Sequence, residues 1–471
     1  MRKTVATLLV VALFVGLFGF SGLLTVRAVQ ANVIEMTVGS TKAYINNKQS
    51  ILDQPPIIEN GTTLVPFRFI GEAIGATIGW DAATKTVKYV FGNITIVLKI
   101  GSTAATVNGV GKTLTVAPKI LPSGRTVVPV RFISETLGAN VAWNSSTKMV
   151  TVTASATPPG EKAFTFRMAG VKNDSDPASA AMLLFAKTVN QNSNGTITVK
   201  TYSNSVLGTI NDLLTDMTNG TVDLVYNTLS CYSWLSGATK FNITSAPFFW
   251  KSTAELLAFV NSPTVQQWID DSANATGVRV LIANGQLPPR ELTANKPIKN
   301  ADDFKGLKIR TAQSALVQAI MKKLGAVPVV IPLADLYMGL KTGVADAQEN
   351  NFFTVKTSSL YEVQKYFMQD DYIRDVSSIF ISNKDWNAMS ARQQKVMKDA
   401  AKAATDFEAQ TIVDTTTQTM AFLASKMTKV DIDVASIQDK LGTDIYQQFD
   451  GTLWPAGTLN VALTFKKSYG G

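Results

Sequence analysis

Segments with strand and helix patterns alternate along the chain after residue 160, and this alternation restricts the fold more than any other feature. Phe164–Met168 alternates like a strand, an Asp-Pro start and an Asn-Gly stop bound a helix over 176–194, and 197–202 alternates as a second strand. The same order recurs over 306–349. Such alternation is typical of parallel sheets with helices on both faces. The sequence therefore predicts an α/β protein with two lobes, arranged as a clamshell.

A long helix is expected after these two runs. Ser390-Ala391-Arg392-Gln393 has the form of a capping box, in which the Ser and Gln side chains satisfy backbone N–H groups at a helix start. The residues that follow predict a helix that continues well past Phe407. A helix of that length would span both lobes and limit how far they hinge.

The front of the chain contains an internal repeat. Val65–Ile70 recurs as Val128–Ile133 and Trp80 recurs as Trp143, each displaced by 63 residues. Each copy has the pattern of a β-rich run, a short helix, a turn and a closing strand. We therefore expect a small, duplicated, β-rich N-terminal domain over 33–154 in which the two copies share a core. The expected short helices and closing strands are 68–74, 131–137, 86–90 and 149–153.

The N-terminus has the layout of a secretory signal over 1–31. Arg2 and Lys3 precede an apolar run over 5–24, and Ala31 ends a stretch of small residues that suits cleavage. The apolar run is also long enough to span a bilayer, so an uncleaved membrane anchor is the alternative. Both interpretations predict an exported protein: extracellular, cell-wall or membrane-associated on the outer side of the cytoplasmic membrane. Residues 155–161, which are rich in Pro, are expected to form a stiff linker.

The residue types that are missing argue against catalysis. The chain has no histidine and a single cysteine, Cys231. Ser-His-Asp and Cys-His sites and imidazole metal ligands are therefore excluded, and we find no motif for carboxylate-pair or lysine chemistry. We expect no enzyme, no cofactor and no metal. The apolar neighbours of Cys231 predict that it is a buried small hydrophobe.

Positive charge is concentrated in the front segment. Residues 1–159 hold 14 Lys and Arg against 6 Asp and Glu, whereas 160–471 hold 30 against 29. A basic surplus on the N-terminal domain would suit an anionic cell-wall polymer or a membrane surface, with simple solubility as the alternative. No nucleic-acid partner is expected.

Two parts of the chain resemble known families. The pattern VPxRFI…LGA…W(D/N)xxTK occurs twice over 33–154 and resembles the copper amine oxidase N-terminal-like, or stalk, domain. The resemblance implies a spacer or a surface-association unit. It implies no copper here, because the module has no His or Cys to bind it.

The second resemblance covers residues 162–450. Six ordered blocks are similar to the solute-binding subunit of TRAP (tripartite ATP-independent periplasmic) transporters of the dicarboxylate type. The blocks are 194–208, 246–249, 290–298, 302–310, 336–350 and 361–366. The resemblance implies a periplasmic-binding-protein-like receptor for a small organic carboxylate, which works with TRAP-type membrane permease subunits. Residues 451–471 form a C-terminal tail that matches nothing we can place.

The resemblance also assigns site residues. A carboxylate has two coplanar oxygens, and a guanidinium offers a matching planar fork of N–H donors. Arg310 ends a predicted strand, where ligands of open α/β sheets are usually bound, and the resemblance makes it the primary carboxylate clamp. Arg290 matches the family's second arginine, and Asn350 matches the amide after the Gln-Glu pair. Candidate wall positions, with core packing as the alternative, are Leu333, Tyr226, Asn227 and Trp234.

The chain departs from the family in the first lobe. The family often has histidines after the first strand and before the long helix, where this chain has Asp176-Pro177 and Asp370-Asp371-Tyr372. Ligand contacts from the first lobe are therefore not carried over. Two other functions stay open: a sensory receptor that uses the same trap, and a wall-associated structural protein.

Overall fold

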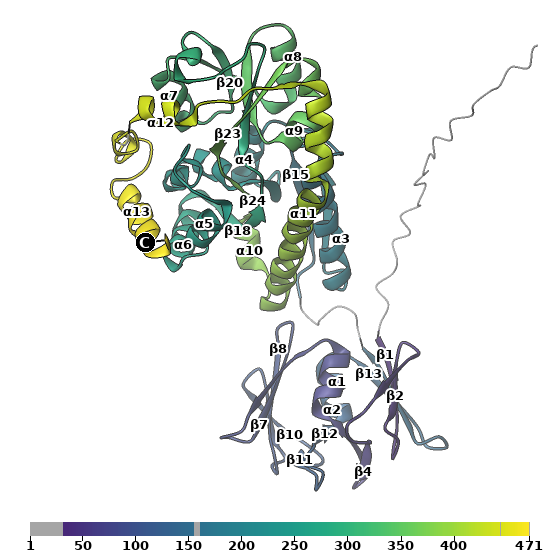
Figure 1. The fold of residues 1–471 in the computed structure, drawn as a ribbon. Coiled ribbons are helices and arrows are strands. Elements are labelled where there is room, and N and C mark those ends of the chain that lie inside the picture. The colour runs from purple at the N-terminus through teal and green to yellow at the C-terminus, as the bar shows by residue number, and fades with distance from the viewer. Residues whose placement is uncertain (1–31, 155–160, 443, 471) are drawn as a thin grey trace, which may run out of the picture.

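The structure is a computed structural model that describes residues 32–154, 161–442 and 444–470. It contains two separately packed parts (Figure 1). One hydrophobic core draws only on residues of 34–154, and the large cores that follow draw only on residues from Phe164 onward. The expected signal segment, 1–31, and most of the expected linker lie outside the described residues. Glu161 is described, and its carboxylate pairs with Arg392 at the start of the long helix.

The N-terminal domain is a duplicated β-structure, as the repeat predicts. Its elements are β1 (Asn32–Thr37), β2 (Lys42–Ile45), β3 (Lys48–Ile51), β4 (Ile57–Glu59), β5 (Thr62–Pro66), α1 (Phe67–Ile74), β6 (Thr77–Asp81), β7 (Thr86–Phe91), β8 (Ile94–Lys99), β9 (Ala104–Val107), β10 (Val110–Thr113), β11 (Lys119–Ile120), β12 (Thr126–Pro129), α2 (Val130–Thr136), β13 (Asn140–Asn144) and β14 (Met149–Ala154). They form three antiparallel sheets, ordered β13-β14-β1-β2-β3, β10-β9-β8-β7-β6 and β11-β12-β5-β4.

The two copies interlock around an approximate twofold axis. In the pairing of β5 with β12, Val65 lies opposite Val128, which is its own equivalent 63 residues later. The first strand of the domain, β1, pairs with the last, β14, so each copy completes a sheet begun by the other. The shared core predicted for the two copies is confirmed.

The second part has two α/β lobes. Lobe 1 contains β15 (Phe164–Gly170), α3 (Pro177–Asn192), β16 (Ile197–Tyr202), α4 (Ile210–Asn219), β17 (Leu224–Thr228), η1 (Leu229–Trp234), η2 (Thr239–Ser245), α5 (Thr253–Val260), α6 (Pro263–Thr276), β18 (Val278–Gln286), β24 (Val376–Ser382) and α10 (Asn383–Ala388). Lobe 2 contains β19 (Arg290–Ala294), η3 (Ala301–Phe304), β20 (Lys308–Thr311), α7 (Ala315–Lys323), β21 (Val327–Val330), η4 (Leu333–Asp335), α8 (Leu336–Lys341), β22 (Ala347–Asn350), α9 (Phe352–Thr357), η5 (Leu360–Glu362), β23 (Tyr366–Ile373) and β25 (Thr428–Lys429).

The sheets are mixed rather than purely parallel. The predicted β-α-β units are parallel, as in the pairing of β15 with β16 and of β20 with β21. The chain crosses from lobe 1 to lobe 2 between β18 and β19 and returns between β23 and β24. These crossover strands join the sheets antiparallel, in the orders β16-β15-β17-β24-β18 and β21-β20-β22-β19-β23-β25.

The predicted lobe-spanning helix is α11 (Ala391–Lys426), which runs along both lobes (Figure 1). It starts at the predicted capping box, with Ser390 and Gln393 each capping the other's backbone N–H. It packs against α3 and β18 in lobe 1 and against α9 and β25 in lobe 2.

The C-terminal tail is part of the packed domain. After α11 the chain forms α12 (Val434–Leu441), η6 (Gln447–Phe449) and α13 (Thr458–Gly470). The first of these helices packs on α7 and η3 in lobe 2, and the last packs on α5 and η2 in lobe 1. Trp454 is buried between them, and Lys466 pairs with Glu255 at 3.1 Å. The segment after α11 therefore contacts both lobes, and the helix of the predicted tail, α13, packs on lobe 1.

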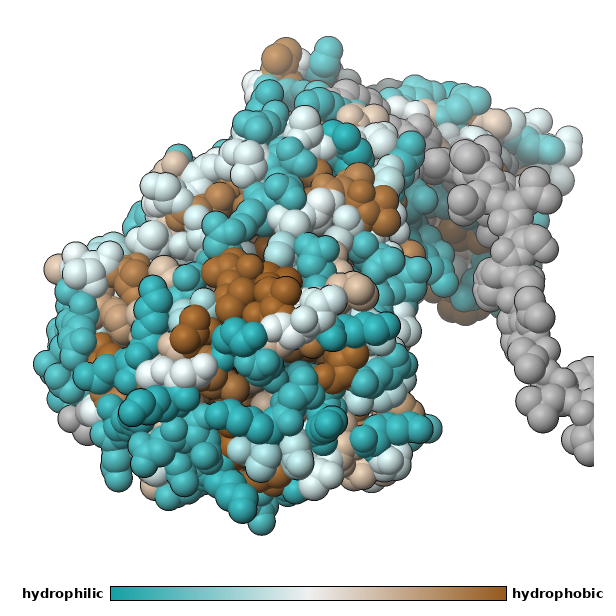
Figure 2. All heavy atoms as spheres, turned by 90° about the horizontal axis from the view of Figure 1, so that it is seen from above, coloured by the Kyte–Doolittle hydropathy of each residue, from teal (hydrophilic) through white to brown (hydrophobic). Residues whose placement is uncertain are grey.

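Apolar side chains gather on the end of lobe 2 that carries α8 (Figure 2). The large apolar side chains of lobe 2 that stay exposed are Val327, Val330, Met338 and Val344. Two of them lie on β21, an edge strand in which Pro328 lacks a backbone N–H. None of the helices in the described ranges is long and apolar enough to cross a membrane.

Candidate ligand-binding site

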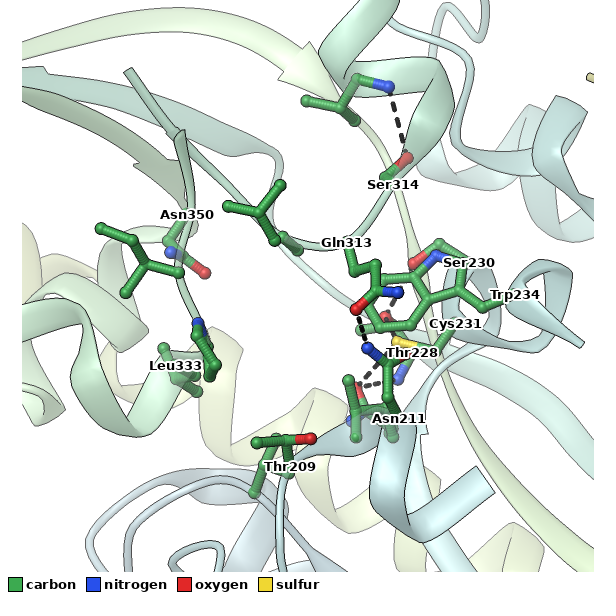
Figure 3. Close-up of a pocket in the computed structure, with 18 of the residues that line it drawn as sticks. Thr209, Asn211, Thr228, Ser230, Cys231, Trp234, Gln313, Ser314, Leu333 and Asn350 are labelled. Atoms are coloured by element: carbon green, nitrogen blue, oxygen red, sulfur yellow. Dashed lines mark hydrogen bonds between the residues drawn. The ribbon is translucent and has the colours of Figure 1, made fainter. Parts of the chain in front are cut away.

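A cleft lies between the lobes, with an empty volume of about 1050 Å³, open solvent included. Strand ends supply part of its polar lining, since β17 ends with Asn227 and Thr228, β20 carries Arg310, and β22 ends at Asn350. Figure 3 shows Thr228, Ser230, Cys231 and Trp234 from lobe 1 on one side, with Leu333 and Asn350 from lobe 2 opposite them. The cleft therefore lies at the carboxyl ends of parallel strands, where this fold class binds ligands.

Arg310 presents an unpaired cation to the cleft. Its side chain is 3% exposed, its Nε donates to the Ile331 carbonyl at 2.8 Å, and no carboxylate forms an ion pair with it among the described residues. Burial lowers its pKa to about 10, which still leaves the guanidinium charged at neutral pH. A buried charge without a counter-ion is costly. The terminal amino groups of Arg310 are thus placed to bind an anion.

Arg290 also borders the cleft, but its charge is already matched. Its guanidinium grips the Glu349 carboxylate with both Nε and Nη2, and Nη2 also donates to the Glu349 carbonyl at 2.9 Å. Burial opposes the charge of Arg290, yet Glu349 outweighs burial and raises the pKa of Arg290. Arg310 is therefore the arginine of the described cleft without an ion-pair partner, and Arg290 helps to shape the wall.

The other predicted positions divide between two cavities. Asn350 borders the cleft and donates to the Gln348 side chain at 2.7 Å, and no described residue donates to its own side-chain oxygen. Leu333, Asn227 and Trp234 also line the cleft. Tyr226 does not, because successive residues of a strand point to opposite faces. It lines a smaller neighbouring cavity instead, where its hydroxyl donates to Glu408 on α11 at 2.9 Å.

Several lining residues escaped the sequence analysis. Asn211 donates to the Gln313 side chain across the mouth of the cleft, which joins lobe 1 to lobe 2 (Figure 3). Lys172 follows the end of β15 and donates to the Thr354 hydroxyl of lobe 2 at 2.6 Å. Its position just after the end of β15 was the available signal, because ligands of this fold class bind near strand ends. Burial lowers the pKa of Lys172.

Cys231 is buried, as predicted, and it also lines the cleft. Burial raises the pKa of its thiol to about 12. The thiol therefore stays protonated at neutral pH and behaves as a small, unreactive part of the wall.

The buried carboxyl of Glu408 should make the stability of the protein depend on pH in an unusual way. Burial raises its pKa from 4.5 to about 7, and Asp176 adds to the effect. Between about pH 7 and pH 4.5 the folded protein therefore holds a proton that the unfolded chain has lost, so stability rises as the pH falls. From pH 8 to pH 5.5 we expect Glu408 to add about 2 kcal/mol to the free energy of unfolding.

Urea unfolding at the two pH values measures this effect. Glu408→Gln should reduce the gain on acidification but not abolish it, because burial also raises the pKa values of Glu291 and Asp370, two carboxyls that lie against each other. An equal pH response in the wild type and the variant would contradict the prediction.

Comparison with known proteins agrees with the resemblance in both parts of the chain. The profile of the bacterial extracellular solute-binding protein family 7 matches residues 168–450, which is more than half of the chain. The profile of the copper amine oxidase N-terminal domain matches residues 24–87 and 44–152.

Individual relatives match a little more than half of the chain. A solute-binding protein of Roseobacter denitrificans is 26% identical over 58% of this chain and 84% of its own length. The sialic acid-binding periplasmic protein SiaP of Vibrio cholerae is 27% identical, with the same two coverages. A crystal structure of a TRAP periplasmic solute-binding protein from Roseobacter denitrificans with bound L-galactonate has a TM-score of 0.59, at 24% identity. It covers 65% of this chain and 100% of its own, and the likeness shows the bilobed fold.

Proposed function

The chain belongs to the bacterial extracellular solute-binding protein family 7, and on that premise we propose that it binds a small organic carboxylate at Arg310 and delivers it to a TRAP-type membrane permease. It would do so outside the cytoplasm, as a receptor without enzymatic activity. The relatives support the ligand class: one binds sialic acid, another binds 2,3-diketo-L-gulonate, and the similar crystal structure contains L-galactonate.

The observation that carries the proposal is the buried, unpaired guanidinium of Arg310. Its Nε is occupied by the Ile331 carbonyl, so both terminal amino groups are left for the two oxygens of one carboxylate. Because Arg290 is neutralised by Glu349 and the Lys172 amine donates to Thr354, Arg310 is the cation of the described cleft that best suits a carboxylate.

Hydrogen bonds between the lobes support a trap that closes over its ligand. Besides the Asn211–Gln313 bond at the mouth, Lys172 donates to Thr354, and the Thr357 hydroxyl donates to Asp176 at 3.3 Å. A ligand favours the closed form only if it binds that form more tightly than the open one. The exposed apolar side chains at the end of lobe 2 offer the permease a surface to dock on. Attachment of the N-terminal domain to a wall polymer or membrane surface stays a prediction.

A thermal-shift screen of residues 32–471 against organic acids tests the proposal. At 100 times its dissociation constant, a ligand adds about 2.7 kcal/mol to the free energy of unfolding, which raises the melting temperature by several degrees. We expect such a shift with at least one carboxylate, and none with the neutral sugar or alcohol of the same carbon skeleton. If no acid shifts the melting temperature, or if the neutral analogues shift it equally, the proposal is wrong.

A further inference from the structure

A second, smaller cavity opens beside the cleft. Lys172, Asn227, Thr228 and Arg290 border both spaces, so these side chains form the boundary between the two cavities. The rest of the second cavity is formed by the start of α3, the start of α9, the crossover strands and α11. It therefore lies where the two lobes and the lobe-spanning helix come together.

The second cavity holds polar groups whose bonding capacity is not used within the protein. The Ser377 hydroxyl is buried beside Glu408 and Tyr226 and affects the pKa of both, yet none of its contacts among the described residues has full hydrogen-bond geometry. Glu408 is 2% exposed, and the Tyr226 hydroxyl bonds one of its two carboxyl oxygens. The Lys172 amine has three donors and spends one of them on Thr354. Buried polar groups normally have hydrogen-bond partners. The spare bonding capacity of Ser377, Glu408 and Lys172 therefore indicates that a polar group from outside the chain occupies the cavity.

The charges around the second cavity restrict what that group is. Asp176 and Glu408 carry negative charge when ionised, against the single positive charge of Lys172, and Arg290 is balanced by Glu349. A second carboxylate on the ligand would be repelled here. A neutral hydroxyl fits, because it can donate to an acid oxygen and accept from Lys172 or Ser377.

We propose that the second cavity is a subsite for the hydroxylated far end of a monocarboxylate held at Arg310, and that Glu408 on α11 selects for that end. The inference rests on the proposed function, which supplies the carboxylate at Arg310. It adds that the preferred ligand is long enough to reach from β20 to α11, that it bears a hydroxyl at its far end, and that a dicarboxylate of the same length is disfavoured.

Calorimetric titration of residues 32–471 tests the subsite with ligands of two lengths. The probes are two hydroxylated six-carbon monocarboxylates, L-galactonate and D-gluconate, the three-carbon acid glycerate, and the six-carbon dicarboxylate adipate. The wild type should bind one of the six-carbon hydroxy acids at least 10-fold more tightly than either glycerate or adipate. Glu408→Gln should lower the affinity for that acid by about 10-fold, which corresponds to the loss of one charge-assisted hydrogen bond. The affinity for glycerate should stay within twofold of the wild type.

Two controls separate the subsite from a change in the fold and from the proposed function. Asp406→Asn removes an exposed carboxylate from the same helix, where it pairs with Lys402. It should change neither the affinity for the six-carbon hydroxy acid nor the affinity for glycerate. Ser377→Ala is a smaller change in the same cavity. It should also lower the affinity for the six-carbon acid while leaving the affinity for glycerate unchanged. Equal losses for long and short acids, tighter binding of adipate, or no effect of Glu408→Gln would overturn the subsite. If other acids still bind in a manner that needs Arg310, the proposed function survives that failure.

Discussion

Replacing Arg310 by alanine should weaken the binding of the carboxylate at least 100-fold. A bidentate guanidinium–carboxylate contact provides two charge-assisted hydrogen bonds, each worth about 1.5–3 kcal/mol when buried. Their combined loss corresponds to more than two factors of ten in the dissociation constant, at about 1.4 kcal/mol for each factor. Calorimetry with the acid identified by the thermal-shift screen measures the change directly.

The ligand-free protein should tolerate this substitution. Arg310 is buried and has no acidic partner among the described residues, so its removal relieves a desolvation cost and breaks one bond, to Ile331. We expect the melting temperature without ligand to stay within a few degrees of the wild type, or to rise. Arg310→Lys is the matched control, since it keeps the charge but loses the planar fork, and it should bind at least 10-fold more weakly. Wild-type affinity in the alanine variant would refute the role of Arg310.

Replacing Glu349 by glutamine should have the largest effect on stability. The substitution leaves the Arg290 guanidinium, whose side chain is 20% exposed, without its counter-ion. Removing one partner of a buried ion pair typically costs about 3–5 kcal/mol, because the other charge stays buried and uncompensated. The free energy of unfolding from urea titration should fall by that amount.

An exposed ion pair provides the control for this prediction. Arg131 and Glu135 form a pair on α2 with both side chains about half exposed, so Glu135→Gln should change stability by less than about 1 kcal/mol. Replacing the buried pair together, as Arg290→Met with Glu349→Leu, should recover most of the stability that Glu349→Gln loses. If Glu349→Gln costs no more than Glu135→Gln, the pair is not the buried, coupled unit described here.

Local sequence patterns predicted most of the elements but not how they join. The strands at Phe164 and Lys308 and the capped start of α11 follow from periodicity and capping, which act within a few residues. The exchange of strands between the two repeats and the antiparallel crossover strands depend on pairing between distant segments. No local pattern reports that pairing, which is why the sheets were predicted as parallel. The packing of Trp454 onto the lobes was missed for the same reason.

The same division applies to the site. Arg310 and Asn350 end strands and belong to blocks that resemble the family, so sequence reasoning reached them. Tyr226 and Glu408 form their hydrogen bond across 182 residues of chain, and Lys172 meets Thr354 across the same number. Neither contact has a local signature. The second cavity could therefore not be predicted from the sequence, because it is formed by contacts between the two lobes and α11.

A crystal structure of the protein with its carboxylate bound tests the central claim most directly. We expect both oxygens of the ligand's carboxylate to lie within hydrogen-bond distance of the two terminal amino groups of Arg310, with Arg290 still paired to Glu349. A ligand whose acid group rests on any other side chain, with Arg310 turned away from it, would contradict the account.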